Sequence, residues 1–88
     1  MLEQPVEDHL TLRVNGLGGM AIKLHPTISG LPDRLVLLPK ARIYFVELKK
    51  PKGGIVSVVQ AAIKKRLEML GFTVLILNTK EKIDEHIN

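Results

Sequence analysis

The feature that most constrains the fold is a change of hydrophobic period in the second half of the chain. Residues Arg42–Lys49 have the composition of a β-strand, and Phe72–Leu77 is a second apolar run rich in β-branched residues. Between them, after Gly53-Gly54, apolar residues recur at helical spacing from Val56 to Leu70. A strand, a helix and a strand in that order predict a right-handed crossover. The last strand is therefore expected to lie parallel to the strand at Arg42–Lys49.

The first half of the chain predicts one helix and two more strands. The helix begins near Pro5 and carries apolar residues at spacings of four, four and three, namely Val6, Leu10, Val14 and Leu17. Proline and glycine then separate the strands Met20–His25 and Arg34–Leu38. The connection from Arg34–Leu38 to the next strand is short enough for an antiparallel hairpin, whereas the pairing of the first strand stays open.

A last short helix is predicted over roughly Thr79–Ile87. Asn78 is the expected N-cap, and Glu81 follows it three residues later. The expected order is therefore helix, three strands, helix, strand and helix. This is an α/β fold in which an αβββαβ core with a mixed four-stranded sheet is followed by a short C-terminal helix.

Length and composition predict one small domain spanning residues 1–88. Hydrophobic residues make up 45% of the chain, so a packed core is expected, and the absence of cysteine excludes disulfides and thiolate zinc sites. Apolar runs such as Leu35–Leu38 are far shorter than the roughly 20 residues of a membrane helix. Glu3, Glu7 and Asp8 stand where a secretory signal would be basic. We expect a cytoplasmic protein without membrane contact.

Three charged residues are predicted to converge on one site. Glu47 and Lys49 are two residues apart on a predicted strand, so their side chains point the same way, roughly 6.5–7 Å apart along the strand. Asp33 begins the neighbouring strand, and adjacent strands lie about 4.8 Å apart. The Asp33 carboxylate is therefore expected to reach the same point as that of Glu47. An exposed pair on the solvent face of the strand is the alternative for Glu47 and Lys49.

Two carboxylates and an ammonium group suit metal-assisted hydrolysis of a phosphodiester. A hard divalent cation such as Mg²⁺ prefers oxygen ligands, which Asp33 and Glu47 offer. Such a cation makes water a better nucleophile near neutral pH and neutralises charge on the phosphodiester. Lys49 adds positive charge beside the water or the phosphate.

These residues resemble a known family. The pair Pro32-Asp33 and Glu47-Leu48-Lys49, with the expected order of elements, is similar to the PD-(D/E)XK nuclease superfamily. Three longer strings resemble its VRR-NUC (virus-type replication-repair nuclease) branch, namely Gly30–Arg34, Phe45–Lys49 and Ser57–Gln60. The resemblance covers about residues 7–77. It implies a restriction-endonuclease-like fold and a DNA endonuclease that depends on Mg²⁺ or Mn²⁺.

The resemblance also implies a role for each matching residue. Asp33 and Glu47 would be metal ligands, and Lys49 would be the catalytic lysine. Glu7, on the first helix, matches an additional acidic residue that can complete the metal site. Gln60, on the crossover helix, matches a glutamine that approaches the site.

Several of these residues also have a purely structural explanation. Asp33 follows a proline and suits a turn, and Glu7 in a first helical turn complements the helix dipole. Gln60 forms a potential capping box with Ser57, and both roles can hold at once. Glu3 lies one turn before Glu7, so a shifted helix would offer Glu3 to the site instead.

Basic residues flank the proposed site in sequence, and DNA is the partner they favour. They predict a groove that tracks phosphates with salt-sensitive, sequence-independent affinity, although a solvated surface is the simpler explanation for some of them. The residues are Lys50, Lys52, Lys64, Lys65 and Arg66.

The resemblance extends to assembly and substrate. Standalone VRR-NUC proteins form homodimers that act on branched DNA, so an activity like that of a Holliday-junction resolvase is expected, in a bacterial or phage setting. A small core with an uncovered sheet edge also favours pairing with a second copy. The alternatives are a DNA-binding module of the same fold without catalysis, and a nuclease for flaps or RNA.

Overall fold

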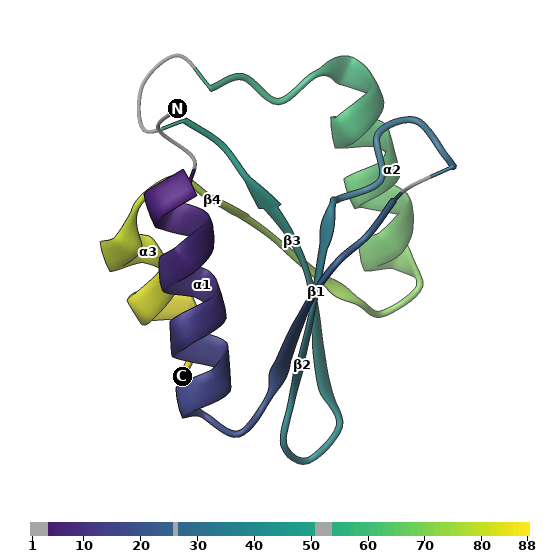
Figure 1. The fold of residues 1–88 in the computed structure, drawn as a ribbon. Coiled ribbons are helices and arrows are strands. Elements are labelled where there is room, and N and C mark those ends of the chain that lie inside the picture. The colour runs from purple at the N-terminus through teal and green to yellow at the C-terminus, as the bar shows by residue number, and fades with distance from the viewer. Residues whose placement is uncertain (1–3, 26, 51–53) are drawn as a thin grey trace.

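The computed structural model describes residues 4–25, 27–50 and 54–88, and in these residues it contains three helices and four strands. Their order confirms the predicted α/β fold (Figure 1). The elements are α1 Gln4–Gly16, β1 Met20–Lys23, β2 Arg34–Leu38, β3 Arg42–Leu48, α2 Val58–Met69, β4 Thr73–Leu77 and α3 Lys80–His86. None of the described helices is long and apolar enough to cross a membrane.

The strands form one mixed sheet in the order β1-β2-β3-β4. β2 and β3 pair antiparallel, as the short connection predicts, and β3 and β4 pair parallel, as the crossover predicts. The pairing of β1 that the sequence left open is antiparallel to β2. In register, Phe45 on β3 lies between Leu35 on β2 and Val74 on β4. This register places alternate residues of each strand on opposite faces of the sheet.

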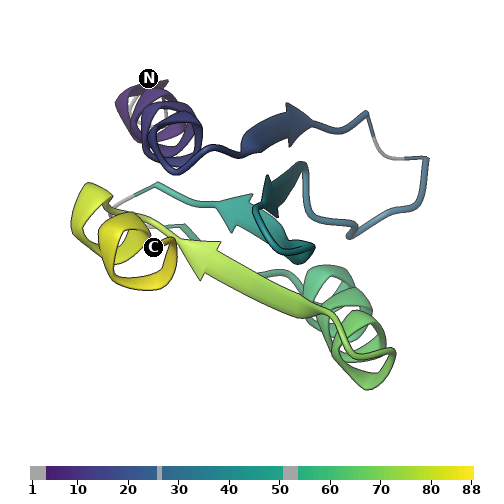
Figure 2. The same ribbon diagram turned by 90° about the horizontal axis from the view of Figure 1, so that it is seen from below.

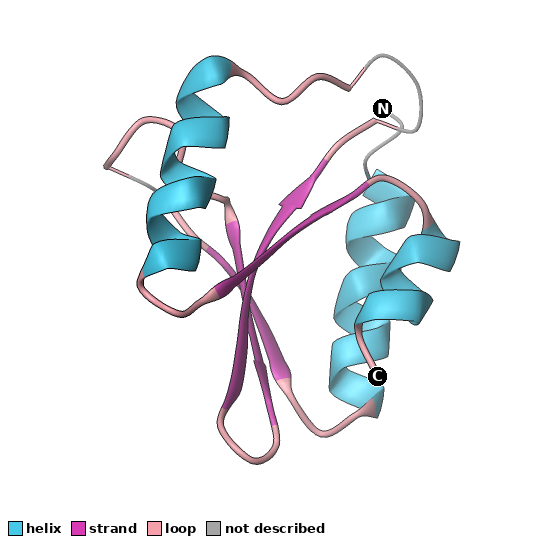
Figure 3. Cartoon of the chain, turned by 180° about the vertical axis from the view of Figure 1, so that it is seen from behind, coloured by secondary structure: helices cyan, strands magenta, loops and turns pink. Residues whose placement is uncertain are grey.

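The helices divide between the two faces of the sheet. Figures 1 and 3, seen from opposite sides, both place α2 across the sheet from α1 and α3. α1 contacts β1, β2 and α3, whereas α2 packs on the edge strand β4. Figure 2 shows α1 and α3 side by side at one end, and α2 at the other.

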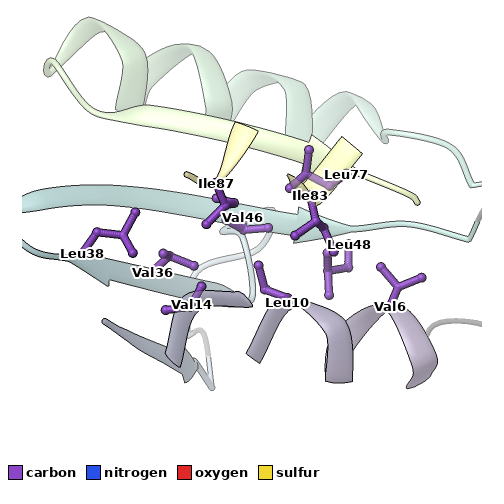
Figure 4. Close-up of a cluster of buried hydrophobic side chains, with 10 residues drawn as sticks. All are labelled: Val6, Leu10, Val14, Val36, Leu38, Val46, Leu48, Leu77, Ile83 and Ile87. Atoms are coloured by element: carbon purple, nitrogen blue, oxygen red, sulfur yellow. The ribbon is translucent and has the colours of Figure 1, made fainter. Parts of the chain in front are cut away.

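One continuous core lies between the sheet and the α1–α3 pair (Figure 4). The predicted stripe of α1 supplies three of its residues, and the inward faces of the strands, α3 and the residue that follows α3 supply the rest. The core consists of Val6, Leu10, Val14, Val36, Leu38, Val46, Leu48, Leu77, Ile83 and Ile87. Polar contacts at the surface also join α1 to α3 and the residue after it. His9 Nε2 lies 2.8 Å from Asp84 Oδ1, and Arg13 Nε donates to Ile87 O at 2.8 Å.

The predicted N-cap of the last helix is wrong by one residue. Thr79 caps α3, because its hydroxyl oxygen accepts a hydrogen bond from the Lys82 N–H at 3.1 Å. Glu81 is consequently the second residue of the helix, one position too early to close a capping box with Thr79. Asn78 is drawn inward, and its Oδ1 atom is buried without a hydrogen-bond partner among the described residues.

Candidate active site

Strand β3 presents Glu47 and Lys49 on the face of the sheet that α2 covers. The Lys49 Nζ atom lies 3.6 Å from Glu47 Oε2, and the two side chains are 17% and 14% exposed. The backbone N–H of Lys49 donates to Leu77 O at 2.9 Å, so pairing with β4 continues one residue past the end of β3. The two side chains therefore stand on rigid backbone in a partly covered position, unlike a pair on a solvent face.

Asp33 lies at the end of the connection between β1 and β2. Gly30 in this loop has a φ of 86°, and a Cβ atom there would lie 2.7 Å from both Cγ1 and the carbonyl oxygen of Val59 on α2. Only glycine fits this close approach without strain. Beyond it, the Leu24 N–H donates to Asp33 O at 2.8 Å, which extends the pairing of β1 and β2 to Asp33. The glycine three residues before Asp33 thus lets the loop rest on α2 while Asp33 enters the sheet.

Asp33 and Glu47 form an acidic pair in a partly buried site. Burial raises the pKa of Glu47 above its ordinary value of 4.5, and the negative charge of Asp33 adds to the rise. Lys49 opposes this increase in pKa through its charge and a hydrogen bond, and the Asp33 backbone opposes it too. The Oδ1 atom of Asp33 is buried, and no hydrogen-bond donor among the described residues reaches it.

The chemistry of this pair fits a hard divalent cation. Such a cation takes carboxylate oxygens as ligands, and it would satisfy Asp33 Oδ1 and stabilise the ionised form of Glu47 together. In the described part of the chain, no group of three or more His, Cys, Asp or Glu residues is arranged to hold a metal. The pair would therefore supply two protein ligands, and Mg²⁺ sites commonly have one or two protein carboxylates.

Gln60 combines the two roles that the sequence suggested. Ser57 caps α2 by accepting from the Gln60 N–H at 3.1 Å, and Gln60 Oε1 accepts from the Ser57 N–H at 3.1 Å. The same Oε1 atom accepts from Lys49 Nζ at 2.9 Å. The capping box of α2 thus fixes an oxygen that orients the lysine.

Glu7 lies on α1 and contacts a residue that the sequence analysis did not single out. Its Oε1 atom is 2.6 Å from Nη2 of Arg34, whose side chain is only 8% exposed. Arg34 Nη1 lies 3.2 Å from Asp33 Oδ2. Arg34 shares the inward face of β2 with Val36 and Leu38. A charged residue in this alternating apolar series is the sequence signal that could have predicted a buried ion pair. Glu3 lies outside the described residues.

The predicted DNA-binding lysines differ in their surroundings. Lys50 and Lys65 are exposed, whereas Lys64 pairs with Glu68 on the same helix, with Nζ and Oε2 2.8 Å apart. Lys52 lies outside the described residues. Arg66 is exposed and borders a groove of about 200 Å³ that is otherwise apolar.

Comparisons with known proteins identify the family. No protein-family model matches the chain. A protein named "Putative nuclease p44", from Acyrthosiphon pisum secondary endosymbiont phage 1, is 40% identical over 80 residues, which cover 90% of this chain and 85% of that protein. A solved structure described as a VRR_NUC domain matches with a TM-score of 0.90 and 32% identity, over 100% of this chain and 99% of that chain. Together with the fold and the Asp33–Glu47–Lys49 arrangement, these similarities show that the chain belongs to the VRR-NUC family of nucleases.

Proposed function

We propose that the protein is a divalent-metal-dependent endodeoxyribonuclease with its active site at Asp33, Glu47 and Lys49. The observation that carries the proposal is the buried Asp33 Oδ1 atom, which lacks a donor among the described residues and shares an acidic site with Glu47. A lysine 3.6 Å from Glu47 adds the positive charge that cleavage of a phosphodiester requires. Membership of a nuclease family supports the same chemistry.

Asp33 and Glu47 are the residues that would hold Mg²⁺ or Mn²⁺. When bound, the cation supplies positive charge for the phosphodiester and for the attacking water. Both carboxylates project from a paired β-sheet, so their backbone positions are set before metal or substrate arrives. Pre-set ligands reduce the reorganisation that binding requires.

Lys49 supplies a second positive charge to the reacting phosphate or the attacking water. Gln60 Oε1 and Glu47 Oε2 hold its ammonium group from two sides, at 2.9 Å and 3.6 Å. Gly54 allows the chain to return close to this lysine, because a Cβ atom at Gly54 would lie 2.8 Å from Lys49 Cβ. The lysine is therefore packed and oriented before DNA binds.

A cleavage assay with a labelled four-way DNA junction tests this function. We expect nicks in Mg²⁺ or Mn²⁺, none in chelator, and none with Asp33→Asn in either metal. Glu85→Gln, a change to an exposed carboxylate on α3, should cleave like the wild type. Binding of the junction without cleavage in any metal would contradict the enzyme and favour a DNA-binding module.

Branched DNA is the proposed substrate, and exposed Lys50 and Lys65 are suited to contact its phosphates. Lys64 would contribute after exchanging Glu68 for a phosphate. Lys52, which the sequence adds to this set, lies outside the described residues. The test compares a junction, a flap, linear duplex and RNA at matched concentrations. Preference for the junction is expected, and equal cleavage of all four would contradict a structure-specific enzyme.

The proposed assembly is a homodimer that forms through α2. Seven of the eleven large apolar residues exposed among the described ones lie on α2 or next to its ends, namely Ile55, Val56, Val58, Val59, Met69, Leu70 and Phe72. Soluble monomers rarely expose an apolar surface of this kind without a partner. A second copy would cover it and would bring two active sites to one branched DNA. Sedimentation equilibrium should give twice the chain mass of 9.8 kDa, and a monomer at high micromolar concentration would contradict the assembly.

A further inference from the structure

Arg34 joins the two faces of the sheet at the edge of the active site. Among the described residues it is the one charged residue that is buried, and its guanidinium contacts two carboxylates. Nη2 lies 2.6 Å from Glu7 Oε1, and Nη1 lies 3.2 Å from Asp33 Oδ2. Nη1 also donates to the backbone oxygen of Asp33 at 3.3 Å. These three contacts restrain the orientation of the buried guanidinium.

The contacts of Arg34 divide the two oxygens of Asp33 between two tasks. Oδ2 is engaged by the guanidinium, whereas Oδ1 is buried and has no donor among the described residues. The ion pair at 3.2 Å restrains the side-chain torsions of Asp33. Arg34 therefore fixes which oxygen of Asp33 is offered to the site that it shares with Glu47.

The charges of the site suit a single divalent cation. Three carboxylates, Glu7, Asp33 and Glu47, stand against two cations, Arg34 and Lys49. Arginine stays charged at every accessible pH, so the space between Glu7 and Asp33 already contains a permanent positive charge. One net negative charge remains, and the unpartnered oxygen of Asp33 lies in the site that Asp33 shares with Glu47.

We propose that Arg34 is a positioning residue for the metal site, and that Glu7 serves this site by holding Arg34 while each chain binds one divalent cation at Asp33 and Glu47. The inference rests on the proposed function. Ligation by Glu7 through Oε1 would require breaking its ion pair with Arg34, which would leave a buried guanidinium with one partner fewer. Among the described residues, Glu7 also does not form a group of three metal-binding side chains with Asp33 and Glu47. Direct contact of Arg34 with DNA is disfavoured because only 8% of its side chain is exposed.

Calorimetric titration of Mn²⁺ into the DNA-free protein tests the proposal without relying on activity. The wild type should bind one ion per chain. Arg34→Lys keeps the charge but loses the planar fork, so the Mn²⁺ affinity should fall by about tenfold, the lower end of the usual effect of residues that orient metal ligands. Glu7→Gln should change the affinity by less than about threefold, because its amide oxygen can still accept from Arg34. Glu85→Gln, on an exposed part of α3, is the control with unchanged binding.

Each contrary result identifies what fails. Two ions per chain, with one of them lost in Glu7→Gln, would make Glu7 a ligand and overturn the proposal while leaving the nuclease intact. Unchanged Mn²⁺ affinity in folded Arg34→Lys would overturn the positioning role. A wild type that neither binds Mn²⁺ nor cleaves DNA would instead refute the proposed function.

Two further measurements keep the test decisive. Circular dichroism establishes that each variant is folded. If Arg34→Lys is not, the ion count of the wild type and the affinity of Glu7→Gln still decide whether Glu7 is a metal ligand. DNA affinity in chelator should be the same for Arg34→Lys and the wild type. A loss of DNA affinity there would show that Arg34 contacts phosphate directly, which would overturn its assignment as a positioning residue.

Discussion

The two faces of the sheet are covered by helices to different extents. On one face, α1 and α3 enclose a core in which residues such as Leu10, Val14 and Ile83 have no exposed surface. On the other face, none of the residues of α2, all of them described, is buried. Leu70 next to this helix is 73% exposed. The closed face is therefore expected to determine stability, while the open face is available for catalysis and assembly.

The proposed active site receives residues from both faces of the sheet. Glu47, Lys49 and Gln60 belong to the open face, whereas Glu7 reaches Arg34 from the closed face. Asp33 is in contact with Arg34 and is also electrostatically coupled to Glu47. The core therefore does more than hold the sheet together, because it also anchors a charged network that borders the proposed metal site.

The largest effect on stability should come from opening the closed face. Leu10→Ala removes a fully buried side chain and should lower the free energy of unfolding by about 2–5 kcal/mol. Leu12→Ala, on the same helix but 71% exposed, should change it by less than about 0.5 kcal/mol. Urea denaturation measures both. Equal losses for the two leucines would contradict the assigned core.

The next effect should be on assembly through the open face. Leu70→Glu places a charge on the proposed dimer surface and should weaken dimerisation by at least about tenfold, because burial of a leucine contributes roughly 1.5–3 kcal/mol. Leu12→Glu is a matched control, since the two leucines are 73% and 71% exposed on opposite faces. Sedimentation equilibrium compares the variants. A dimer that survives Leu70→Glu but dissociates in Leu12→Glu would place the interface on α1.

A smaller effect distinguishes two helix caps that are similar in chemistry. Ser57→Ala and Thr79→Ala should each lower the free energy of unfolding by about 1 kcal/mol, because each removes the side-chain acceptor of an N-cap. Only Ser57→Ala should also slow DNA cleavage, because it removes the hydroxyl that accepts from the Gln60 N–H and so loosens the helix end that carries the Lys49 partner Gln60. Thermal unfolding and cleavage are measured on both variants. Equal cleavage rates in Ser57→Ala and Thr79→Ala would show that the capping box of α2 does not influence catalysis.

The smallest effect concerns pH. Burial and the charge of Asp33 raise the pKa of Glu47 in the folded state above 4.5. The stability that this shift contributes is fully present below the unfolded-state pKa, and it is lost as the pH rises through the higher folded-state pKa. In chelator, the free energy of unfolding should therefore fall more steeply with pH above 4.5 in the wild type than in Glu47→Gln.

Denaturation in urea across this pH range provides the comparison. Glu85→Gln, with an exposed carboxylate on α3, should retain the slope of the wild type. The same slope in Glu47→Gln as in the wild type would show that this carboxyl is not perturbed.

Local sequence signals predicted the strands and the acidic pair because these depend on residues near one another in the chain or on adjacent strands. Alternation on β3 placed Glu47 and Lys49 together, and the loop after Gly30 placed Asp33 on the next strand. Arg34 escaped prediction because its partner Glu7 arrives from a helix packed on the opposite face. Contacts between a helix and a strand depend on how the layers of the fold pack together. The hydrophobic period of a single segment gives no information about that packing.

The ends of the helices show the same limit. Asn78 and Thr79 are both suitable caps, and the choice between them depends on where β4 delivers the chain to α3. The apolar stripe of the crossover helix predicted a covered face, yet the helix rests on the edge strand β4 and much of its apolar surface is open. A hydrophobic period identifies the face of a helix but not how much sheet lies opposite it.

The most direct test of the central claim is the single-turnover rate at which Lys49→Ala cleaves a four-way junction at saturating Mg²⁺. Lys80→Ala, an exposed lysine on α3, is the matched control. We predict a rate about 10²–10³-fold below that of the wild type for Lys49→Ala, with unchanged folding, and an unchanged rate for Lys80→Ala. A Lys49→Ala rate within a few-fold of the wild type would contradict an active site built from Asp33, Glu47 and Lys49.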